Sequence, residues 1–251
     1  MQPSIEGRSL SLPGDDVVDV WTIWIPDAVA YTETFERILS SDEIQKAARF
    51  LRTEDRTRYV VAHGFLRKLL GKYLEMEPTA LSFITNGFGK PALAQSYARQ
   101  PLCFNFAHSG DVILCAVTTG RQVGVDVEAI KSSLDVMELA RAQFADEEVT
   151  GLGSLSSDER QEAFFRVWTR KEAFLKARGD GLQFGLNRFA VSVKPDPAPI
   201  LSWVDGDPAA SKNWSIIDIG IGYGYVAALA VERPPVSVSM RVWTSNFDAV
   251  L

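Results

Sequence analysis

The sequence predicts an α+β protein made of two similar lobes, each with a long helix packed on an antiparallel sheet. Two long stretches, around residues 54–74 and 157–179, carry apolar residues at three- and four-residue steps, which is typical of helices. Each is preceded and followed by short β-branched or aromatic runs typical of strands. This order recurs after Gly120, although the two halves share no convincing sequence identity. We therefore expect an N-terminal lobe (1–120) and a C-terminal lobe (121–251), related by pseudo-twofold symmetry.

Composition excludes several classes of protein. The 251 residues are 46% hydrophobic, which is enough for a substantial core, yet no apolar run reaches the roughly 18 residues of a membrane span. The first residues have neither the basic nor the apolar region of a secretory signal. Cys103 and Cys115 have no metal-ligand spacing and favour buried thiols in a reducing compartment. A net charge of −6 argues against nucleic-acid binding. We expect a cytoplasmic protein that binds neither nucleic acid nor membrane.

The elements of the first lobe follow from local signals. Ser40 and the acidic residues after it form a helix start, because a serine side chain can accept hydrogen bonds from the first turn. Asn86–Pro91 and His108–Asp111 are rich in turn residues. The expected order is a strand at 17–25, helices at 41–50 and 54–74, a strand at 81–85, a turn and loop to Pro101, and a hairpin formed by 103–107 and 112–118.

The second lobe begins with a strand at 122–129, followed by helical segments from 134 to 144 and from 146 onward. Its long helix is expected to start near Ser157 and to end at Gly179, since glycine readily takes the left-handed conformation that closes a helix. The Gly220–Gly224 segment lacks the spacing of a dinucleotide-binding loop and precedes a strand, so we reject that function. The remaining strands are expected at 189–193, 214–219, 223–231 and 236–243, with loops at 195–199 and 204–208.

Charged residues lie on the apolar face of the second long helix. Lys171 falls inside the apolar arc, Glu172 lies between Trp168 and Phe165, and Lys176 follows one turn later. A charge on a buried face must be paired, bound to a ligand or solvated, because desolvating a lone ion costs several kcal/mol. The alternative is an ordinary surface pair between Glu172 and Lys176, worth about 0.2–0.5 kcal/mol.

Two carboxylates share one face of the strand that opens the second lobe. In Gly124–Glu128, the alternation of a strand puts Val125 and Val127 on one side, and Asp126 and Glu128 on the other. Adjacent carboxylates suit a hard divalent cation such as Mg²⁺, and Glu172 would supply a third oxygen ligand. The alternative is the solvent face of an amphipathic strand.

Basic residues gather in the first lobe. Between Lys46 and Lys72 there are eight basic residues against two acidic ones, which indicates either an anionic ligand or a solvated basic helix face. His108 stands at a strand end, where it could meet a phosphate or form local turn hydrogen bonds. Lys90 follows two glycines, so its backbone could approach an anion, or it is an ordinary loop residue. We interpret His63 as structural.

Three segments in this order resemble a known family: FNFAHSG (104–110), GVDVE (124–128) and WTRKEAFLKARGDGL (168–182). The set is similar to that of the 4′-phosphopantetheinyl transferases, specifically the larger two-lobed, surfactin-synthetase-activating (Sfp) type. The likeness extends to NGFGKPAL (86–93), to Arg49-Phe50 and to residues 55–58. It spans about residues 46–182.

The resemblance implies an enzyme that moves the 4′-phosphopantetheine arm of coenzyme A onto a serine of an apo carrier protein. The carriers would be the acyl or peptidyl carrier domains of polyketide, peptide or fatty-acid synthases, as in secondary metabolite biosynthesis, and adenosine 3′,5′-bisphosphate would be released. The active site would lie at the lobe interface of a monomer. The implied metal ligands for Mg²⁺ (or Mn²⁺) are Asp126, Glu128 and Glu172.

The same resemblance implies catalytic roles for Glu172 and Lys176. Glu172, or a water held by the metal, would be the base for the carrier serine, and Lys176 would neutralise charge on the pyrophosphate or leaving group. The implied coenzyme A-binding residues are Lys46, Arg58, Lys90, Pro91, His108, Ser109, Lys171 and Lys176.

The sequence departs from the family pattern at three positions. Val127 supplies no metal ligand, Glu43 stands where some relatives have a lysine, and Ala107 stands where a serine is frequent. The mixed segment Leu134–Phe144 is a candidate for carrier docking, with an ordinary packed helix as the alternative.

Two other functions compete with transfer. The first is a coenzyme A-binding module without activity, which would not need the metal ligands and the base together. The second is an unrelated Mg²⁺-dependent phosphotransferase using ATP, although the chain has neither a GxxxxGK[ST] loop nor a kinase-type glycine loop.

Overall fold

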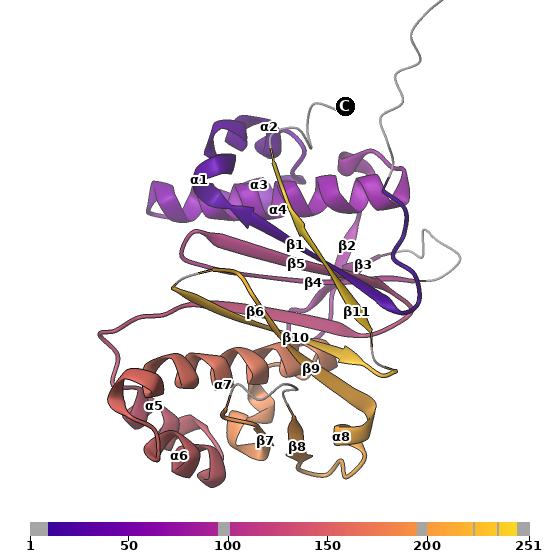
Figure 1. The fold of residues 1–251 in the computed structure, drawn as a ribbon. Coiled ribbons are helices and arrows are strands. Elements are labelled where there is room, and N and C mark those ends of the chain that lie inside the picture. Colours follow the sequence, from indigo (N-terminus) through magenta and orange to yellow (C-terminus); the bar gives the residue numbers. More distant parts are fainter. Residues whose placement is uncertain (1–9, 95–100, 195–199, 223, 235, 245–251) are drawn as a thin grey trace, which may run out of the picture.

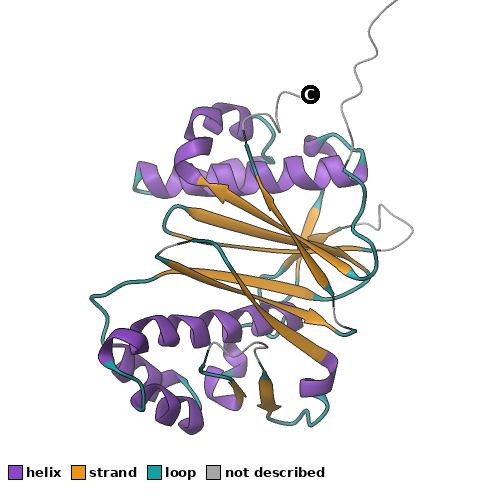
Figure 2. Ribbon diagram, viewed as in Figure 1, coloured by secondary structure: helices purple, strands orange, loops and turns teal. Residues whose placement is uncertain are grey.

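The computed structural model describes residues 10–94, 101–194, 200–222, 224–234 and 236–244. They fold into layers: a long helix, a mixed sheet, a second sheet and another long helix (Figure 1). The helices lie on the outside and the sheets face each other in the middle (Figure 2). The predicted α+β class with two lobes is confirmed.

The first lobe is built on a sheet with the strand order β11-β1-β5-β4. The long helix α4 (Thr53–Leu74) covers its outer face. The strands are β1 (Val17–Trp24), β4 (Leu102–Ser109), β5 (Val112–Thr119) and β11 (Ser237–Val242). Smaller elements complete the lobe: α1 (Ile25–Ala28), α2 (Thr32–Glu36), α3 (Ser41–Ala47) and the hairpin of β2 (Phe83–Thr85) and β3 (Pro91–Leu93).

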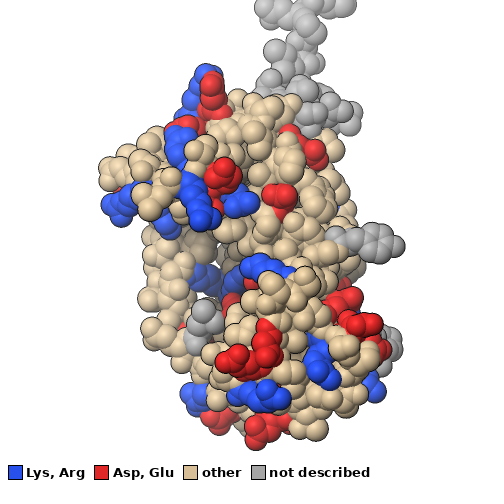
Figure 3. Space-filling view, turned by 90° about the vertical axis from the view of Figure 1, so that its left-hand side faces the viewer, with Lys and Arg blue, Asp and Glu red and all other residues tan. Residues whose placement is uncertain are grey.

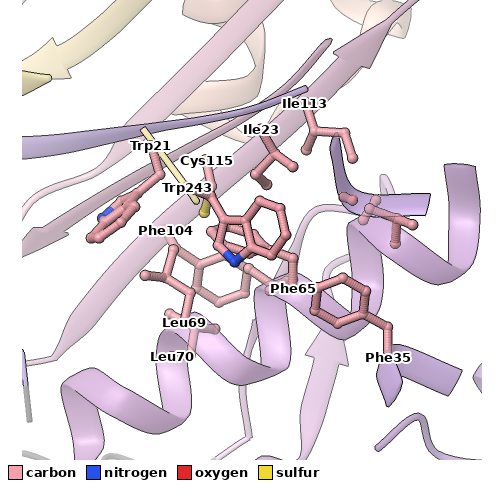
Figure 4. Close-up of a cluster of buried hydrophobic side chains, with 14 of the residues drawn as sticks. Trp21, Ile23, Phe35, Phe65, Leu69, Leu70, Phe104, Ile113, Cys115 and Trp243 are labelled. Carbon is pink, nitrogen blue, oxygen red and sulfur yellow. The ribbon is translucent and has the colours of Figure 1, made fainter. Parts of the chain in front are cut away.

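Aromatic and aliphatic side chains between α4 and this sheet form the first core (Figure 4). Phe65 and Leu69 point from α4 toward Trp21 and Phe104 of the sheet, and all four are at most 5% exposed. Trp243, just after β11, packs into the same cluster and is 2% exposed. Trp243, which follows the last strand, is therefore part of the first lobe's core.

The second lobe has the strand order β6-β10-β9, covered by the long helix α7 (Ser157–Arg178). A capping box of Ser156 and Glu159 starts α7, and Gly179, with φ +78°, ends it, as the sequence predicts. The other elements are β6 (Val123–Ala129), α5 (Val136–Gln143), α6 (Asp146–Gly153), β7 (Phe189–Val191), β8 (Leu201–Val204), α8 (Ala210–Asn213), β9 (Trp214–Ile219) and β10 (Tyr225–Glu232).

The two sheets pack face to face through a third core of small aliphatic residues, including Val18 and Leu114 on one side and Val125 and Leu229 on the other. The last strand departs from the expected division of the chain. β11, which we expected in the second lobe, pairs in parallel with β1 of the first sheet. Arg241 donates to the buried Asp19 at 2.9 Å and so ties this strand to the first lobe. The lobe boundary at residue 120 stays a prediction.

In the part of the chain that the structure describes, no helix is long and apolar enough to cross a membrane. The loops expected at 195–199 and through most of 94–101 lie outside the described residues.

Candidate active site

A close contact between β6 and α7 brings the predicted acidic residues together. A Cβ atom at Gly124 would lie 2.1 Å from the carbonyl oxygen of Ala173 and 2.3 Å from the amide nitrogen of Ala177. Only glycine therefore allows the strand to lie directly on the helix. Asp126 and Glu128 follow on the same face of β6, next to Glu172 and Lys176 of α7. The predicted alternation of β6 is confirmed, because Val125 and Val127 are buried between the sheets.

The carboxylates influence one another in a largely buried setting. Lys176 Nζ donates to Asp126 Oδ1 at 2.6 Å. Burial nevertheless raises the pKa of Asp126 to about 7, against the lowering effect of Lys176, and the charges of Glu128 and Glu172 add to the rise. Burial also raises the pKa of Glu172, opposed by Lys176 and reinforced by Glu128. The three acids and Lys176 thus form one electrostatic cluster.

Two oxygens of this cluster are buried without a hydrogen-bond partner, Asp126 Oδ2 and Glu172 Oε1. Leaving carboxylate oxygens in this state costs free energy that a bound cation would recover. Hard oxygen donors are also the ligands that Mg²⁺ prefers. Among the described residues, however, no group of three His, Cys, Asp or Glu side chains is already arranged around a metal position. The residue types fit a divalent cation, and the metal site itself stays a prediction.

A cavity of about 630 Å³ lies beside the cluster, between the lobes. Its size is within the usual range for small-molecule sites. One wall is the β2–β3 turn and β4 of the first lobe, and the other is the C-terminal half of α7 with the loop after it. Lys and Arg side chains gather around the hollow between the two halves of the molecule (Figure 3). The lining residues are Gly87, Phe88, Gly89, Lys90, Pro91, Asn105, Phe106, Glu172, Leu175, Lys176, Gly179, Gly181 and Gln183.

The β2–β3 turn forms hydrogen bonds with the end of α7. Lys90 Nζ donates to the carbonyl of Ala177 at 2.8 Å and to Gln122 Oε1 at 3.0 Å. Asn86 Nδ2 donates to the carbonyl of Gly179 at 2.9 Å. Lys90 and Pro91 therefore line the cavity, and the ammonium of Lys90 also caps a helix terminus, where a cation is favourable.

His108 lies where charges of both lobes meet. Its pKa is lowered, first by desolvation and then by the charges of Lys176 and Arg58, while Glu128 raises it. Arg58 Nη1 donates to Asp55 Oδ1 at 3.1 Å, and its Nε is buried without a partner. Next to His108, Ser109 Oγ donates to Glu128 Oε2 at 2.8 Å. The structure thus brings His108, Arg58 and Ser109 to the acidic cluster.

Lys46 is more remote from the cavity. Its Nζ lies 5.5 Å from the centre of the Tyr59 ring, which stacks on His63 at 3.8 Å. His63 in turn meets the edge of Phe106, which lines the cavity. His63 is structural, as predicted, because its Nδ1 bonds the carbonyl of Tyr59 and burial lowers its pKa to about 4.

Glu43, a departure from the family pattern, has a structural role. It completes the helix cap of Ser40 and accepts from Arg67 Nε at 2.7 Å. A lysine at this position would lose both interactions.

Lys171 does not join the site. The side chain is 0% exposed, and its Nζ pairs with Glu148 at 2.7 Å and donates to the carbonyl of Leu186 at 2.8 Å. The prediction that Lys171 holds coenzyme A is corrected by these contacts, which occupy the ammonium inside the second lobe. The physical reason is a long-range contact: Glu148 on α6 reaches the ammonium and neutralises its charge away from the cavity.

A second, apolar depression of about 390 Å³ also reaches the cluster, with Glu128 among its lining residues. It includes Leu134 and Leu139, which are 37% and 36% exposed. Both belong to the segment predicted for carrier docking, which forms α5 and the residues before it. The lining residues are Glu128, Lys131, Leu134, Leu139, Gln143, Phe164, Phe165, Trp168, Gly185 and Leu186.

Sequence reasoning missed several residues of the cavity, notably Phe88, Phe106 and Gln183. Aromatic residues in strands and turns are usually assigned to the core, so Phe106 carried no separate signal. Phe88 could have been found from the sequence, because it is an aromatic residue between two glycines of a turn. Its side chain is 54% exposed in the structure.

Comparison with known proteins agrees with this architecture. The second lobe matches a family described as the 4′-phosphopantetheinyl transferase superfamily over residues 122–230. Residues 22–120 match a family described as 4′-phosphopantetheinyl transferase, N-terminal. These matches define the class of protein: a transferase of phosphopantetheine with two lobes.

Individual relatives narrow this class to the family. The 4′-phosphopantetheinyl transferase HetI of Nostoc sp. is 37% identical over 86% of this chain and 88% of its own length. The 4′-phosphopantetheinyl transferase Sfp of Bacillus subtilis (strain 168) is 28% identical over 80% of this chain and 86% of its own. Another 4′-phosphopantetheinyl transferase of Bacillus subtilis is 30% identical over 67% and 72%. The chain belongs to the 4′-phosphopantetheinyl transferase superfamily and is an enzyme of that kind.

Proposed function

We propose that this enzyme holds coenzyme A in the cavity between the lobes and receives an apo carrier protein at the apolar depression beside α5. The observation that carries the proposal is the position of the acidic cluster. Glu172 and Lys176 line the cavity, whereas Glu128 lies at the edge of the depression. A group handed from one side to the other would pass the cluster.

The basic residues of the first lobe support binding of the phosphates. Arg58 and His108 lie close enough to Lys176 for their charges to act together. Lys90 lines the cavity wall, and Lys46 lies beyond its aromatic rim. Several cations around one cavity suit a ligand with a pyrophosphate and a further phosphate, as coenzyme A has.

Asp126, Glu128 and Glu172 would hold Mg²⁺, or Mn²⁺ in its place. Their oxygens are the hard donors this ion requires, and two of them are buried without partners. The bound ion would neutralise charge on the pyrophosphate of coenzyme A. The ammonium of Lys176 would then donate to a phosphate oxygen in place of the Asp126 carboxylate.

In the transfer step, the hydroxyl oxygen of the carrier serine attacks the phosphorus that bears the pantetheine arm. A new oxygen–phosphorus bond forms, the bridging phosphorus–oxygen bond breaks, and adenosine 3′,5′-bisphosphate leaves with the bridging oxygen. Glu172 accepts the serine proton, and its raised pKa makes it a stronger base than an ordinary glutamate. Lys176 stabilises the negative charge that develops on the leaving phosphate.

The depression beside α5 supports the carrier-docking role predicted for Leu134–Phe144. Leu134, Leu139 and Trp168 offer an apolar surface, and Lys131 adds a positive charge at its edge. An acidic carrier helix next to the modified serine would complement this surface.

We further propose that the enzyme works as a monomer in the cytoplasm. One chain contributes both walls of the cavity and all three acids. Cys103 and Cys115 are free thiols, which agrees with a reducing compartment.

The test is incubation of the enzyme with coenzyme A, Mg²⁺ and each of several apo carrier domains, followed by mass spectrometry of the carrier. We expect the carrier to gain one phosphopantetheine arm. Bound coenzyme A with no gain on any carrier would favour the binding-module alternative. A gain of phosphate from ATP would favour the phosphotransferase alternative.

The docking surface can be tested separately with Leu139→Asp. We expect the KM for the carrier to rise by about tenfold or more, because a buried carboxylate replaces an apolar contact, while the KM for coenzyme A stays the same. The control is Val29→Asp, which alters an apolar residue of the first lobe that is 48% exposed. An unchanged carrier KM for Leu139→Asp would remove α5 from the docking surface.

A further inference from the structure

Strands β4 and β6 lie side by side, although they belong to different sheets. Two side chains of β4 bond the backbone of β6 across this junction. Asn105 Oδ1 accepts from the amide of Val125 at 2.9 Å, and Ser109 Oγ accepts from the amide of Ala129 at 3.1 Å. Both bonds join residues 20 positions apart. The side chains of Asn105 and Ser109 thus fix how β4 lies along β6.

Ser109 does more than bond the backbone. Its hydroxyl also donates to Glu128 Oε2 at 2.8 Å. A serine hydroxyl has one hydrogen to donate, and here it is given to a carboxylate. Donation to a phosphate of coenzyme A would break this bond. The family resemblance assigned Ser109 to coenzyme A binding, whereas its contacts connect it to Glu128, one of the predicted metal ligands.

Both lobes hold the turn that carries Ser109. Gly110 has φ +55°, and a Cβ atom there would lie 2.7 Å from the hydroxyl oxygen of Tyr225. That hydroxyl accepts from the amide of Asp111 at 3.1 Å, and the carbonyl of Asp111 accepts from the amide of Ile25 at 2.8 Å. The turn is therefore fixed by β10 of the second lobe and by α1 of the first.

We propose that Ser109 is a positioning residue for Glu128. It holds one carboxylate oxygen so that the other can bind the divalent cation, and it makes this orientation depend on the apposition of the two lobes. Hydrogen bonds of this kind orient metal-binding carboxylates, and their removal typically weakens metal binding by about 10- to 100-fold. The inference rests on the metal site of the proposed function.

The first test measures Mn²⁺ binding by electron paramagnetic resonance, with saturating coenzyme A. Ser109→Ala should weaken Mn²⁺ binding by about 10- to 100-fold. Coenzyme A affinity, measured by calorimetry in EDTA, should stay within about twofold of wild type, since no phosphate contact is lost. Ser109→Thr and Ser109→Val form a matched pair that differs by one hydroxyl group, so Thr should bind Mn²⁺ more tightly than Val whatever the added bulk costs both.

Two further variants separate positioning from a general structural role. Thr119→Val removes a buried hydroxyl that donates to the carbonyl of Pro13 at 3.2 Å, at the far end of β5, and should change stability without weakening Mn²⁺ binding. In a Glu128→Gln background, Ser109→Ala should cause little additional loss, because the bond it removes acts through Glu128.

Wild-type Mn²⁺ affinity in Ser109→Ala, or equal affinities of the Thr and Val variants, would overturn the inference. So would a drop in coenzyme A affinity in EDTA that matches the loss of metal binding, since it would assign Ser109 to the phosphates. Wild-type protein that binds Mn²⁺ but modifies no carrier would refute the proposed function. The comparison of Mn²⁺ affinities between wild type and the Ser109 variants would still test the role of Ser109.

Discussion

The two long helices, α4 and α7, carry charged residues with different surroundings, as Arg67 and Glu172 show. Both have 22 residues and cover the outer face of a sheet. On α4, the guanidinium of the buried Arg67 has hydrogen-bond partners: it donates to Glu43 and to the carbonyls of Pro78 and Leu81. On α7, Glu172 keeps an oxygen that is buried and without a partner, next to a cavity.

The same contrast recurs within α7 itself. Arg170 and Lys171 are both 0% exposed, yet Arg170 pairs with Asp218 and Lys171 with Glu148. Lys171 is directly followed in the chain by Glu172, which has the unsatisfied carboxylate. Burial of a charge therefore does not identify a ligand-binding site, because an ion pair within the fold can offset the cost of desolvating the charge. A buried charged group next to a cavity that still has an atom without a hydrogen-bond partner is a better indication of ligand binding.

The largest expected effect comes from removing an unsatisfied carboxylate. Glu172→Gln and Asp126→Asn should each lower kcat/KM for transfer by about 10³-fold or more, which corresponds to roughly 4 kcal/mol. Both variants should keep the fold, since each preserves the shape of a side chain that leaves an oxygen without a partner. Carrier modification followed by mass spectrometry, with circular dichroism as the check on folding, measures both effects.

Glu162→Gln is the matched control for this comparison. It lies on the same helix, its side chain is 53% exposed, and it pairs with Arg166 at the surface. Its activity should match that of wild type. Near-normal turnover in either Glu172→Gln or Asp126→Asn would show that the unpaired oxygens have no part in the reaction.

Much of this arrangement could be predicted from local sequence. The bounds of α7 follow from a capping serine and a closing glycine, and the shared face of Asp126 and Glu128 follows from the alternation of a strand. Both depend on residues near one another in the chain. The direction in which Lys171 points could not be predicted, because its partner Glu148 is on another helix and carries no signal of pairing.

Long-range packing also decided the other differences. The sequence of β11 is that of a strand, but nothing local shows that it crosses to β1. The bond of Lys90 to the carbonyl of Ala177 depends on where the second lobe places the end of α7, so local sequence does not show it. These features require the three-dimensional contact between segments far apart in the chain.

The saturated pair offers the next test. Lys171→Met leaves the carboxylate of Glu148 buried without its cation, which typically costs about 3–5 kcal/mol. We expect the free energy of unfolding, measured in urea, to fall by roughly this amount. Lys171→Met/Glu148→Gln should recover part of this loss. The double variant should still bind coenzyme A with nearly wild-type affinity by calorimetry. Weaker binding by tenfold or more in this folded variant would restore Lys171 to the ligand site.

The smallest expected effect is a pH dependence that belongs to the acidic cluster. The pKa of Asp126 is raised from 3.8 to about 7 in the folded protein, mainly by burial. Its protonated form therefore stabilises the fold at low pH, and this contribution is lost as the pH rises through about 7. Glu172, whose pKa is raised as well, acts in the same direction.

In EDTA, the free energy of unfolding of the wild type should therefore fall between pH 6 and pH 8 relative to that of Asp126→Asn, by on the order of 1 kcal/mol. Mg²⁺ with coenzyme A should restore stability more at pH 8 than at pH 6, because protons compete with the metal for the carboxylates. Asp126→Asn should show much less of this response. Urea unfolding at the two pH values measures both differences. Parallel changes in wild type and variant would mean that burying the Asp126 carboxylate has no measurable energetic cost. The contrast between the satisfied Arg67 and the unsatisfied carboxylates would then lose its energetic basis.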